Sequence, residues 1–356
     1  MAGFAATIAE SQLDDWVLAT RKKISKEVTD IITPEHPTFR RLEQCGAIDR
    51  QEPGQGPVED VMYATPDRST ILSRSVDLQD REETPVQGIT EAQFDWIMVI
   101  ETLVIPMYEY LNATSANSMT NFVKRKMKQI DIALQNLMVT HLWNGHVEGN
   151  HRIFGISDLV QFDPSSDPTK GAVGRLSVSD LPTWKNVAND YDEEFKQVDA
   201  GGHMGLTVID DANGMLDTYL DCSNNPTGVG PDLMPCNQEF FRFMHNLYRA
   251  GLIFRDDQAN VQLGQEGFRF HNATIYHDRD VPEPSAHVAA GEGVCFFLNC
   301  DSLRWVYASG LEKKWGSMRT LERKTGYAWD QMTQYSMTVN DRRKNGVLFG
   351  VQDYTP

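Results

Sequence analysis

The sequence contains no apolar run that approaches the roughly 20 residues a membrane-spanning helix requires. Its most apolar stretch, "WIMVIETLVIPM" at 96–107, is shorter and includes Glu101. The N-terminal segment also lacks the basic start followed by an apolar core that marks a secretory signal. We therefore expect no contact with a membrane and synthesis in the cytoplasm.

Basic residues are the minority among the charged ones. The 356 residues include 33 Lys and Arg against 50 Asp and Glu, which gives a net charge of −17. Tight binding to a nucleic-acid backbone needs clustered cations, so this balance argues against a protein that reads DNA sequence. It suits a generic soluble protein, and it is also compatible with a surface that touches DNA without gripping it.

Cysteines are few and form no CxxC pair. Their number is odd, their spacings match no zinc ribbon, and thiols normally stay reduced in the cytosol. We expect small buried side chains and no disulfide framework. The five residues are Cys45, Cys222, Cys236, Cys295 and Cys300.

Catalytic motifs are also missing. The string "SNNPTG" at 223–228 resembles the Asn-Pro-Thr-Gly loop of pyridoxal-phosphate aminotransferases, but the chain has no lysine from residue 197 to residue 312 for the Schiff base. We interpret the string as a Pro/Gly turn. No Gly-x-Ser-x-Gly elbow, phosphate loop or HExxH pattern is present.

Candidate metal ligands are weak. Three histidines, His141, His146 and His151, are five residues apart, so they share no helical face. The string "YHDRD" at 276–280 is interpreted as a turn with solvated carboxylates. We expect no cofactor, no metal and no enzymatic activity. The alternative from the enzyme class is a transferase or metal-dependent hydrolase that uses "SNNPTG" or "YHDRD".

The first part of the chain predicts a helix and then a β excursion. A helix over 10–31 ends before Pro34 and Pro37. The strings "VEDVMYA", "STILSRSVDL" and "QFDWIMVIETLVI" predict strands between about 55 and 105. This excursion is either an ordinary sheet edge or a projecting two-stranded arm. Because an isolated hairpin is barely stable in water, a projecting arm would have to lie on a neighbouring molecule.

A long amphipathic helix is expected next, over about 115–143. Ser115 or Ser118 can cap its start, and Asn144 or Gly145 can end it in the left-handed conformation. Such a helix would be a rod on the order of 40 Å long. Its cluster of cations is either a solvated face, a contact with an acidic surface of a neighbouring copy, or a weak contact with DNA. These cations are Lys124, Arg125, Lys126 and Lys128.

The second half predicts two further helices and several short strands. A helix follows the Gly-Gly linker in "GGHMGLTVIDDANGMLDTYLDC", and Asn237 caps another in "QEFFRFMHNLYRAG". Strands are expected in "GFRFHNATIYHD", "GVCFFLN", "QYSMTV" and "GVLFGV". The fold class is α+β with a mixed or antiparallel sheet, because no run of βαβ units is present.

The order of these elements resembles the major capsid proteins of tailed bacteriophages, whose fold is shared with the floor of herpesvirus capsids and with encapsulins. "HPTFRRLEQCGAI" is similar to the end of that family's N-terminal arm, and "TEAQFDWIMVIETLVIPMYEYLNATS" to the return strand of its extended loop. "FGISDLV" and "PTWKNV", with Trp184 and Asn186, resemble the signals that introduce its axial domain. The strings "PDLMPCNQEFF", "LGQEGFRFHNATIYHDRDVP" and "GVCFFLNCDSLRWVY" follow its closing order.

This resemblance implies the organisation of the chain. It places an N-terminal arm at 1–54 and an extended β-hairpin loop at 55–105. A peripheral domain with a spine helix follows at 106–165, an axial domain with a mixed or antiparallel sheet at 166–300, and a C-terminal return at 301–356. Some members cross-link their subunits through an isopeptide bond from a lysine of the extended loop to an asparagine. That reaction is excluded for this loop, because no lysine lies between Lys26 and Lys124.

The function implied by the resemblance is a non-enzymatic shell subunit. Its copies would form hexamers and pentamers of an icosahedral virion capsid around packaged double-stranded DNA. The implied partners are further copies of the chain, a separate scaffolding protein, a portal and a cementing or decoration protein, with only weak non-specific contact to DNA. An encapsulin-like compartment shell, which encloses cargo enzymes, is the alternative within the same class.

The residues expected at contacts between subunits lie in the loop and on the long helix. We expect charge reversal at Arg68 or Arg74 to impair assembly while the isolated subunit stays folded. The full set is Tyr63, Arg68, Arg74, Asp80, Glu82, Glu83, Trp96, Lys124, Arg125 and Lys128.

Overall fold

A computed structural model describes the following residues: 36–54, 56–63, 88–106, 116–191, 214–225, 227–249, 267–283, 287–288, 291–317, 319–320 and 326–352. The helix expected over 10–31 and the strand expected in "STILSRSVDL" lie outside the described residues.

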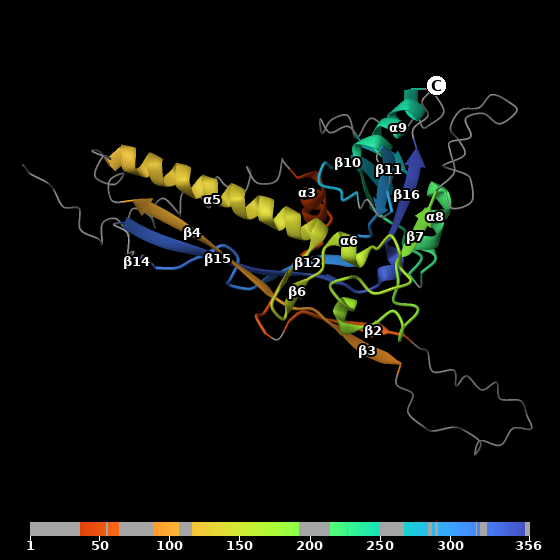
Figure 1. Cartoon of the computed structure of the whole chain (residues 1–356), viewed down its shortest axis with the longest axis horizontal. Coiled ribbons are helices and arrows are strands. Elements are labelled where there is room, and N and C mark those ends of the chain that lie inside the picture. Colours follow the sequence, from red (N-terminus) through yellow and green to blue (C-terminus); the bar gives the residue numbers. More distant parts are fainter. Residues whose placement is uncertain are drawn as a thin grey trace, which may run out of the picture.

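Two six-stranded sheets form the body of the described chain (Figure 1). The first sheet contains β1 (Ile48–Gln51), β4 (Ile97–Pro106), β12 (Leu303–Ala308), β13 (Lys314–Trp315), β14 (Arg319–Thr320) and β15 (Gly326–Val339). The second contains β7 (Val187–Asp190), β16 (Gly346–Gln352), β11 (Glu292–Phe297), β8 (Leu233–Cys236), β10 (Ala273–His277) and β9 (Gly267–Phe270), in that order.

Helices and two hairpins complete the described elements. The helices are α3 (Pro37–Gln44), α5 (Ala116–Asn144), α6 (Ile156–Leu159), α8 (Met215–Ser223) and α9 (Gln238–Arg249), with 3-10 turns η1 (Val173–Arg175) and η3 (Arg342–Lys344). The hairpins are β2 (Val58–Met62) with β3 (Ile89–Gln93), and β5 (His146–Glu148) with β6 (His151–Ile153). The pairs β1–β12, β8–β10 and β7–β16 are parallel and the others antiparallel, so the predicted α+β class with mixed sheets is confirmed.

The long helix expected over 115–143 is α5, and it packs on the first sheet. Apolar side chains four, seven or eight residues apart, among them Val123, Met127, Leu134 and Leu142, are buried on one face. Figure 1 shows α5 running along β4 and β15, away from the second sheet. With 29 residues, the helix is about 44 Å long. It therefore stiffens an arm that projects from the body of the chain.

The end of α5 is fixed by Gly145, one of the two residues that the sequence offered for this role. This residue has a φ of 62°, which favours glycine, and its amide donates to the carbonyl of His141 at 2.8 Å. A side chain here would also collide with the carbonyl oxygen of Ile153 on β6. The turn therefore lets the β5–β6 hairpin fold back against the helix end.

The second sheet is covered by α9 and bordered by α8. The predicted cap is confirmed, because the Asn237 side-chain oxygen accepts from the amide of Phe240 at 3.0 Å. Phe240 and Met244 then point into the core. The backbone of β11 approaches α9 so closely that a Cβ at Gly293 would lie 3.1 Å from the Phe240 Cα. The helix and the sheet consequently form one closed core.

The β excursion expected over 55–105 divides into two structures. β2 and β3 form an antiparallel hairpin that lies below the first sheet in Figure 1. From Ile97 onward, β4 pairs with β15 over ten residue pairs and belongs to the first sheet. Leu103 and Ile105 of β4 are buried, and the division of the chain at residue 105 stays a prediction.

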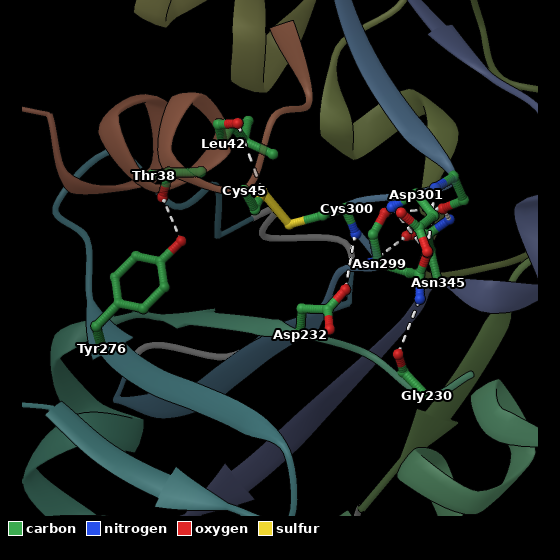
Figure 2. Close-up of a disulfide and its surroundings, with 11 residues drawn as sticks. Thr38, Leu42, Cys45, Gly230, Asp232, Tyr276, Asn299, Cys300, Asp301 and Asn345 are labelled. Atoms are coloured by element: carbon green, nitrogen blue, oxygen red, sulfur yellow. Dashed lines mark hydrogen bonds between the residues drawn. A yellow bond between two sulfur atoms is a disulfide. The ribbon is translucent and has the colours of Figure 1, made fainter. Parts of the chain in front are cut away.

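One pair of cysteines is joined, which corrects the expectation of five reduced thiols. Cys45 at the end of α3 and Cys300 in the turn after β11 form a disulfide, with their Cα atoms 6.2 Å apart (Figure 2). These residues are 255 positions apart, and local spacing carries no signal for such a pair. The other three, Cys222, Cys236 and Cys295, are free and buried, as expected.

Candidate inter-subunit surfaces

The outer face of β4 is apolar and uncovered. Met98 and Ile100 are 50% and 54% exposed, and Val104 lies on the same face, while Leu103 and Ile105 point to α5. The far edge of β4 pairs with no other described strand. A continuous apolar strand is typical of a sheet covered on both faces. Within the described residues, this sheet has a cover on only one face of β4.

One polar position interrupts the outer face of β4. Thr102 donates to the Asp330 carboxylate at 2.7 Å, and Arg319 on β14 pairs with the same carboxylate at 3.0 Å. On β15, apolar Met332 lies opposite Ile100, whereas Gln334 lies opposite Met98. The outer face is consequently apolar toward its start and carries a charged pair further along β4.

The hairpin β2–β3 exposes a second group of apolar side chains, beside the acidic pair Asp60 and Glu91 on the same face. Val61 and Ala92 point toward the body of the chain, whereas Met62 and Ile89 pair across the two strands and are 62% and 61% exposed. Large apolar side chains grouped on an exposed face are typical of an interaction site. Neither residue was among those expected at contacts from the sequence.

The inner face of the first sheet is closed by polar as well as apolar contacts. The Gln331 amide reaches the Asp131 carboxylate on α5 at 3.5 Å. Burial raises the pKa of Asp131 and lowers that of the nearby Lys313. Trp329 and Tyr335 are fully buried beneath the helix. The arm thus has one sealed face and one open face.

Two of the candidate metal-ligand histidines come together at the end of α5. The rings of His141 and His146 stack with centroids 4.7 Å apart, because the turn at Gly145 brings them side by side. His141 Nδ1 lies 2.7 Å from the Tyr335 hydroxyl. Burial, helped by His146 and Lys170, lowers the pKa of His141 to about 4. The two histidines share no helical face, as expected, since His141 lies on α5 and His146 on β5.

The carbonyl end of α5 is held by Lys170. Its ammonium donates to the carbonyl of Asn144 and pairs with Asp158 at 2.6 Å. The same carboxylate accepts from the amide of Gly155 at 2.9 Å. A cation at this position also complements the negative end of the helix dipole. The loop that follows the helix is therefore clamped to it.

Trp184 and Asn186, which carry part of the resemblance, form hydrogen bonds to the backbone of their own chain. The Trp184 indole donates to the carbonyl of Val173 at 3.1 Å, and the Asn186 amide bonds to the backbone of Gln161. Arg342, which the sequence did not indicate, is fully buried and donates to the carbonyls of Trp184 at 3.1 Å and of Leu159 at 2.9 Å. Burial lowers its pKa to about 10. These contacts attach the 156–186 segment to the C-terminal strands.

Helix α3 is fastened to the string "YHDRD". Asp278 is buried and accepts from the Thr38 hydroxyl, and His36 pairs with Asp280 at 3.2 Å. The Tyr276 hydroxyl donates to the oxygen of Thr38 at 3.2 Å (Figure 2). The interpretation of this string as solvated carboxylates is therefore wrong for Asp278. Its burial fixes α3, and with α3 the disulfide at Cys45.

Of the predicted contact residues, few can be placed. Tyr63 follows β2 and is exposed, and Lys128 is exposed on α5. Trp96 is only 8% exposed and packs with Val306 and Ala308, which leaves little of it for another copy. The side chains that lie outside the described residues are those of Arg68, Arg74, Asp80, Glu82, Glu83, Lys124 and Arg125.

The "SNNPTG" string contains an asparagine-stabilised turn. The Asn225 side-chain oxygen accepts from the amide and hydroxyl of Thr227 at 3.0 and 2.6 Å, and Gly228 has a φ of 64°. Among the described residues, no group of three or more His, Cys, Asp and Glu side chains is placed to hold a metal ion. No helix in the same residues is long and apolar enough to cross a membrane.

Comparison with known proteins finds resemblance only among solved structures. No protein-family profile and no curated protein matches the chain. The structure of Gordonia phage Cozz is similar over 88% of this chain and 86% of its own, at 13% identity and a TM-score of 0.46.

Two further structures are similar at 10% identity. The capsid asymmetric unit of cyanophage A-1(L) matches over 86% of this chain and 91% of its own, with a TM-score of 0.49. The holo-SrpI encapsulin complex from Synechococcus elongatus PCC 7942 matches over 91% and 93%, with a TM-score of 0.45. We therefore base the proposed function on the contacts of this chain itself.

Proposed function

We propose that this chain is a shell subunit that assembles with its own copies, through hexamers and pentamers, into an icosahedral capsid around packaged double-stranded DNA. The observation that carries the proposal is the open apolar face of β4. Its sequence is that of a strand buried on both faces, yet Met98, Ile100 and Val104 have no cover among the described residues.

The hairpin β2–β3 supplies a matching surface. Its outer face carries Met62 and Ile89 at one end, so the same chain presents two groups of exposed apolar side chains. The two lie on different elements, which suits contact between unlike surfaces of successive copies. Such head-to-tail contacts generate rings when the rotation closes.

The energies suit reversible assembly. Burying the exposed half of a side chain such as Ile100 contributes roughly 1 kcal/mol. The outer faces of β4 and of the hairpin together offer several such side chains per copy. Contacts that are modest singly become strong when each copy engages several neighbours at once. A shell built this way can correct errors while it forms and still be durable when closed.

The arm formed by α5, β4 and β15 suits a load-bearing element. A helix of 29 residues sealed against a long two-stranded ribbon resists bending, and polar contacts at both Asp131 and His141 fix it to the sheet. The net charge of −17 favours loose, non-specific contact with DNA inside the shell. A separate scaffolding protein, a portal and a decoration protein complete the proposed partners.

The test is whether the purified chain forms particles and whether the outer face of β4 is required. Wild-type protein should sediment as capsomers or megadalton particles and show shells by negative-stain electron microscopy. The double variant Met98→Asp with Ile100→Asp should remain folded and lose the particles, because charges on that face cannot be buried in a contact.

The matched control is Leu220→Asp, which changes an equally exposed apolar residue on α8. It should assemble normally. A wild-type chain that stays monomeric under all assembly conditions would contradict the proposal. Native particles that hold protein cargo and no DNA would keep the shell role but replace the capsid with a compartment shell.

A further inference from the structure

A pocket of about 390 Å³ opens at the root of the β2–β3 hairpin. Its walls come from the end of β3, the β5–β6 hairpin and η1, and its lining includes Gln93, Asp95, Arg152, Phe154 and Arg175. This volume lies within the range of roughly 300–1,000 Å³ that is typical of ligand pockets. We call it the Arg152–Arg175 pocket.

The pocket holds two guanidinium groups and one carboxylate. Arg175 donates to Asp95 at 3.1 Å and to the Gln93 amide oxygen at 3.0 Å. The other Asp95 oxygen accepts from the backbone amide of Arg152 at 3.3 Å. The Arg152 guanidinium donates to the carbonyl of Lys170, and no carboxylate of the described residues forms an ion pair with it. One positive charge is therefore left over.

The position of Arg175 is enforced by packing. Its φ of 63° is uncommon for a residue other than glycine. It follows Gly174, where a Cβ would lie 2.8 Å from the Cβ of Ala92, so η1 is pressed directly onto the hairpin root. Strained backbone of this kind persists where surrounding structure determines it, and it gathers at functional sites.

Arg152 is placed with similar constraint. Gly171 has a φ of 99°, and any side chain there would collide with the Arg152 guanidinium. Phe154 beneath it is buried and excludes water from that side. Arg152 and Arg175 thus bring two positive charges to one cavity, with the Arg175 side chain 65% exposed.

We propose that the Arg152–Arg175 pocket binds an acidic side chain from a second copy of this chain. The inference rests on the shell function proposed above, which brings other copies to the hairpin. Guanidinium groups pair with carboxylates through two parallel hydrogen bonds, and the surplus charge in the pocket equals one carboxylate. The chain offers many candidates, since Asp and Glu exceed Lys and Arg by 50 to 33.

A DNA phosphate fits the pocket less well. Binding to the nucleic-acid backbone draws on several cations along a surface, and this pocket supplies a net charge of only one. Because Asp95 lies two residues after β3, a carboxylate in the pocket would instead fix the hairpin root to a neighbouring copy.

Zero-length cross-linking in particles of mixed isotope content tests the proposal. Arg152→Lys keeps the charge and supplies an amine that a carbodiimide can join to a carboxylate in contact. Particles are assembled from equal amounts of ¹⁴N and ¹⁵N variant protein, cross-linked and digested. We expect a peptide pair, detected by mass spectrometry, that joins position 152 of one isotope to an acidic residue of the other.

The control is Arg242→Lys on α9, where the carboxylate partner Glu239 lies 2.9 Å from the arginine within the same helix. It should give products of a single isotope. If position 152 also gives only single-isotope products, or none, the proposal is overturned.

Neutral variants measure the strength of the contact. Arg152→Gln and Arg175→Gln should each raise the protein concentration for half-maximal assembly about tenfold, as expected for loss of a hydrogen bond to a charged group. Circular dichroism and the Tm of the unassembled subunit should match those of Arg242→Gln.

Three outcomes separate the two proposals. If the wild type and both glutamine variants assemble alike, the pocket proposal fails and the shell proposal stands. If Arg152→Gln changes only the DNA content of particles, the occupant is a phosphate and the pocket proposal is overturned. If the wild type forms no particle, both proposals fail.

Discussion

The two sheets of this chain differ in how completely they are buried. In the second sheet, β11 is buried on both faces from Gly293 to Phe297, because α9 lies on one side and the main core on the other. In the first sheet, β4 buries one face beneath α5 and exposes Met98 and Ile100 on the other. One region completes its core within a single chain, and the other leaves apolar side chains exposed, which the proposed assembly would cover.

The largest expected effect lies in the closed region. Phe240→Ala removes a fully buried ring between α9 and β11, so the free energy of unfolding should fall by about 3–5 kcal/mol. Chemical denaturation of the unassembled subunit measures this. A loss under 1 kcal/mol would contradict the view that the second sheet is complete within one chain.

The disulfide lies at the junction of the two regions, since Cys300 is in the turn between β11 and β12. Cys45→Ser should lower the free energy of unfolding by about 2–4 kcal/mol, because the bond restricts the unfolded chain. Thermal unfolding checks this with and without reductant. Reduced wild type should match the variant, and the variant itself should not respond to reductant.

The inner face of the first sheet should respond to acid. The His141 pKa falls from 6.5 in the unfolded chain to about 4 in the folded one, through burial. Between these values the unfolded chain binds the extra proton, so stability is lost as the pH falls from about 6.5 to 4, by roughly 1–3 kcal/mol.

Denaturant titrations at several pH values measure this loss. His141→Gln should remove that part of the pH dependence, because the amide does not titrate. An unchanged profile would show that the contact between α5 and β15 does not depend on this histidine.

The smallest effect on the isolated subunit is expected at the open face. Ile100→Ala should change the free energy of unfolding by less than about 1 kcal/mol, because half of the side chain is already in water. The same variant should weaken assembly. A large loss of subunit stability with normal assembly would reverse the comparison between the two sheets.

The elements that local signals specify could be predicted from the sequence. The spacing of apolar residues predicted α5, and Gly145 and Asn237 marked where α5 ends and α9 begins. The strand β4 was also recognised, but its partner was not. Apolar residues occur on both faces of β4, so the sequence could not indicate which of the two faces is covered by the same chain.

Contacts between distant segments could not be predicted. Cys45 meets Cys300, and Arg342 meets Trp184, only after the sheets have brought them together. The Arg152–Arg175 pocket has the same origin, because it needs β3, the β5–β6 hairpin and η1 in place at once. The residues expected at the loop tip, such as Arg68 and Arg74, lie outside the described residues and stay predictions.

The disulfide between Cys45 and Cys300 also changes how cleavage of the backbone would be detected. It spans 255 positions, so the two fragments from a single cut between them remain one covalent molecule. A protease that nicks the chain there would leave a single band on a non-reducing gel and two bands after reduction. A single backbone cut between these two cysteines therefore need not release any part of the subunit.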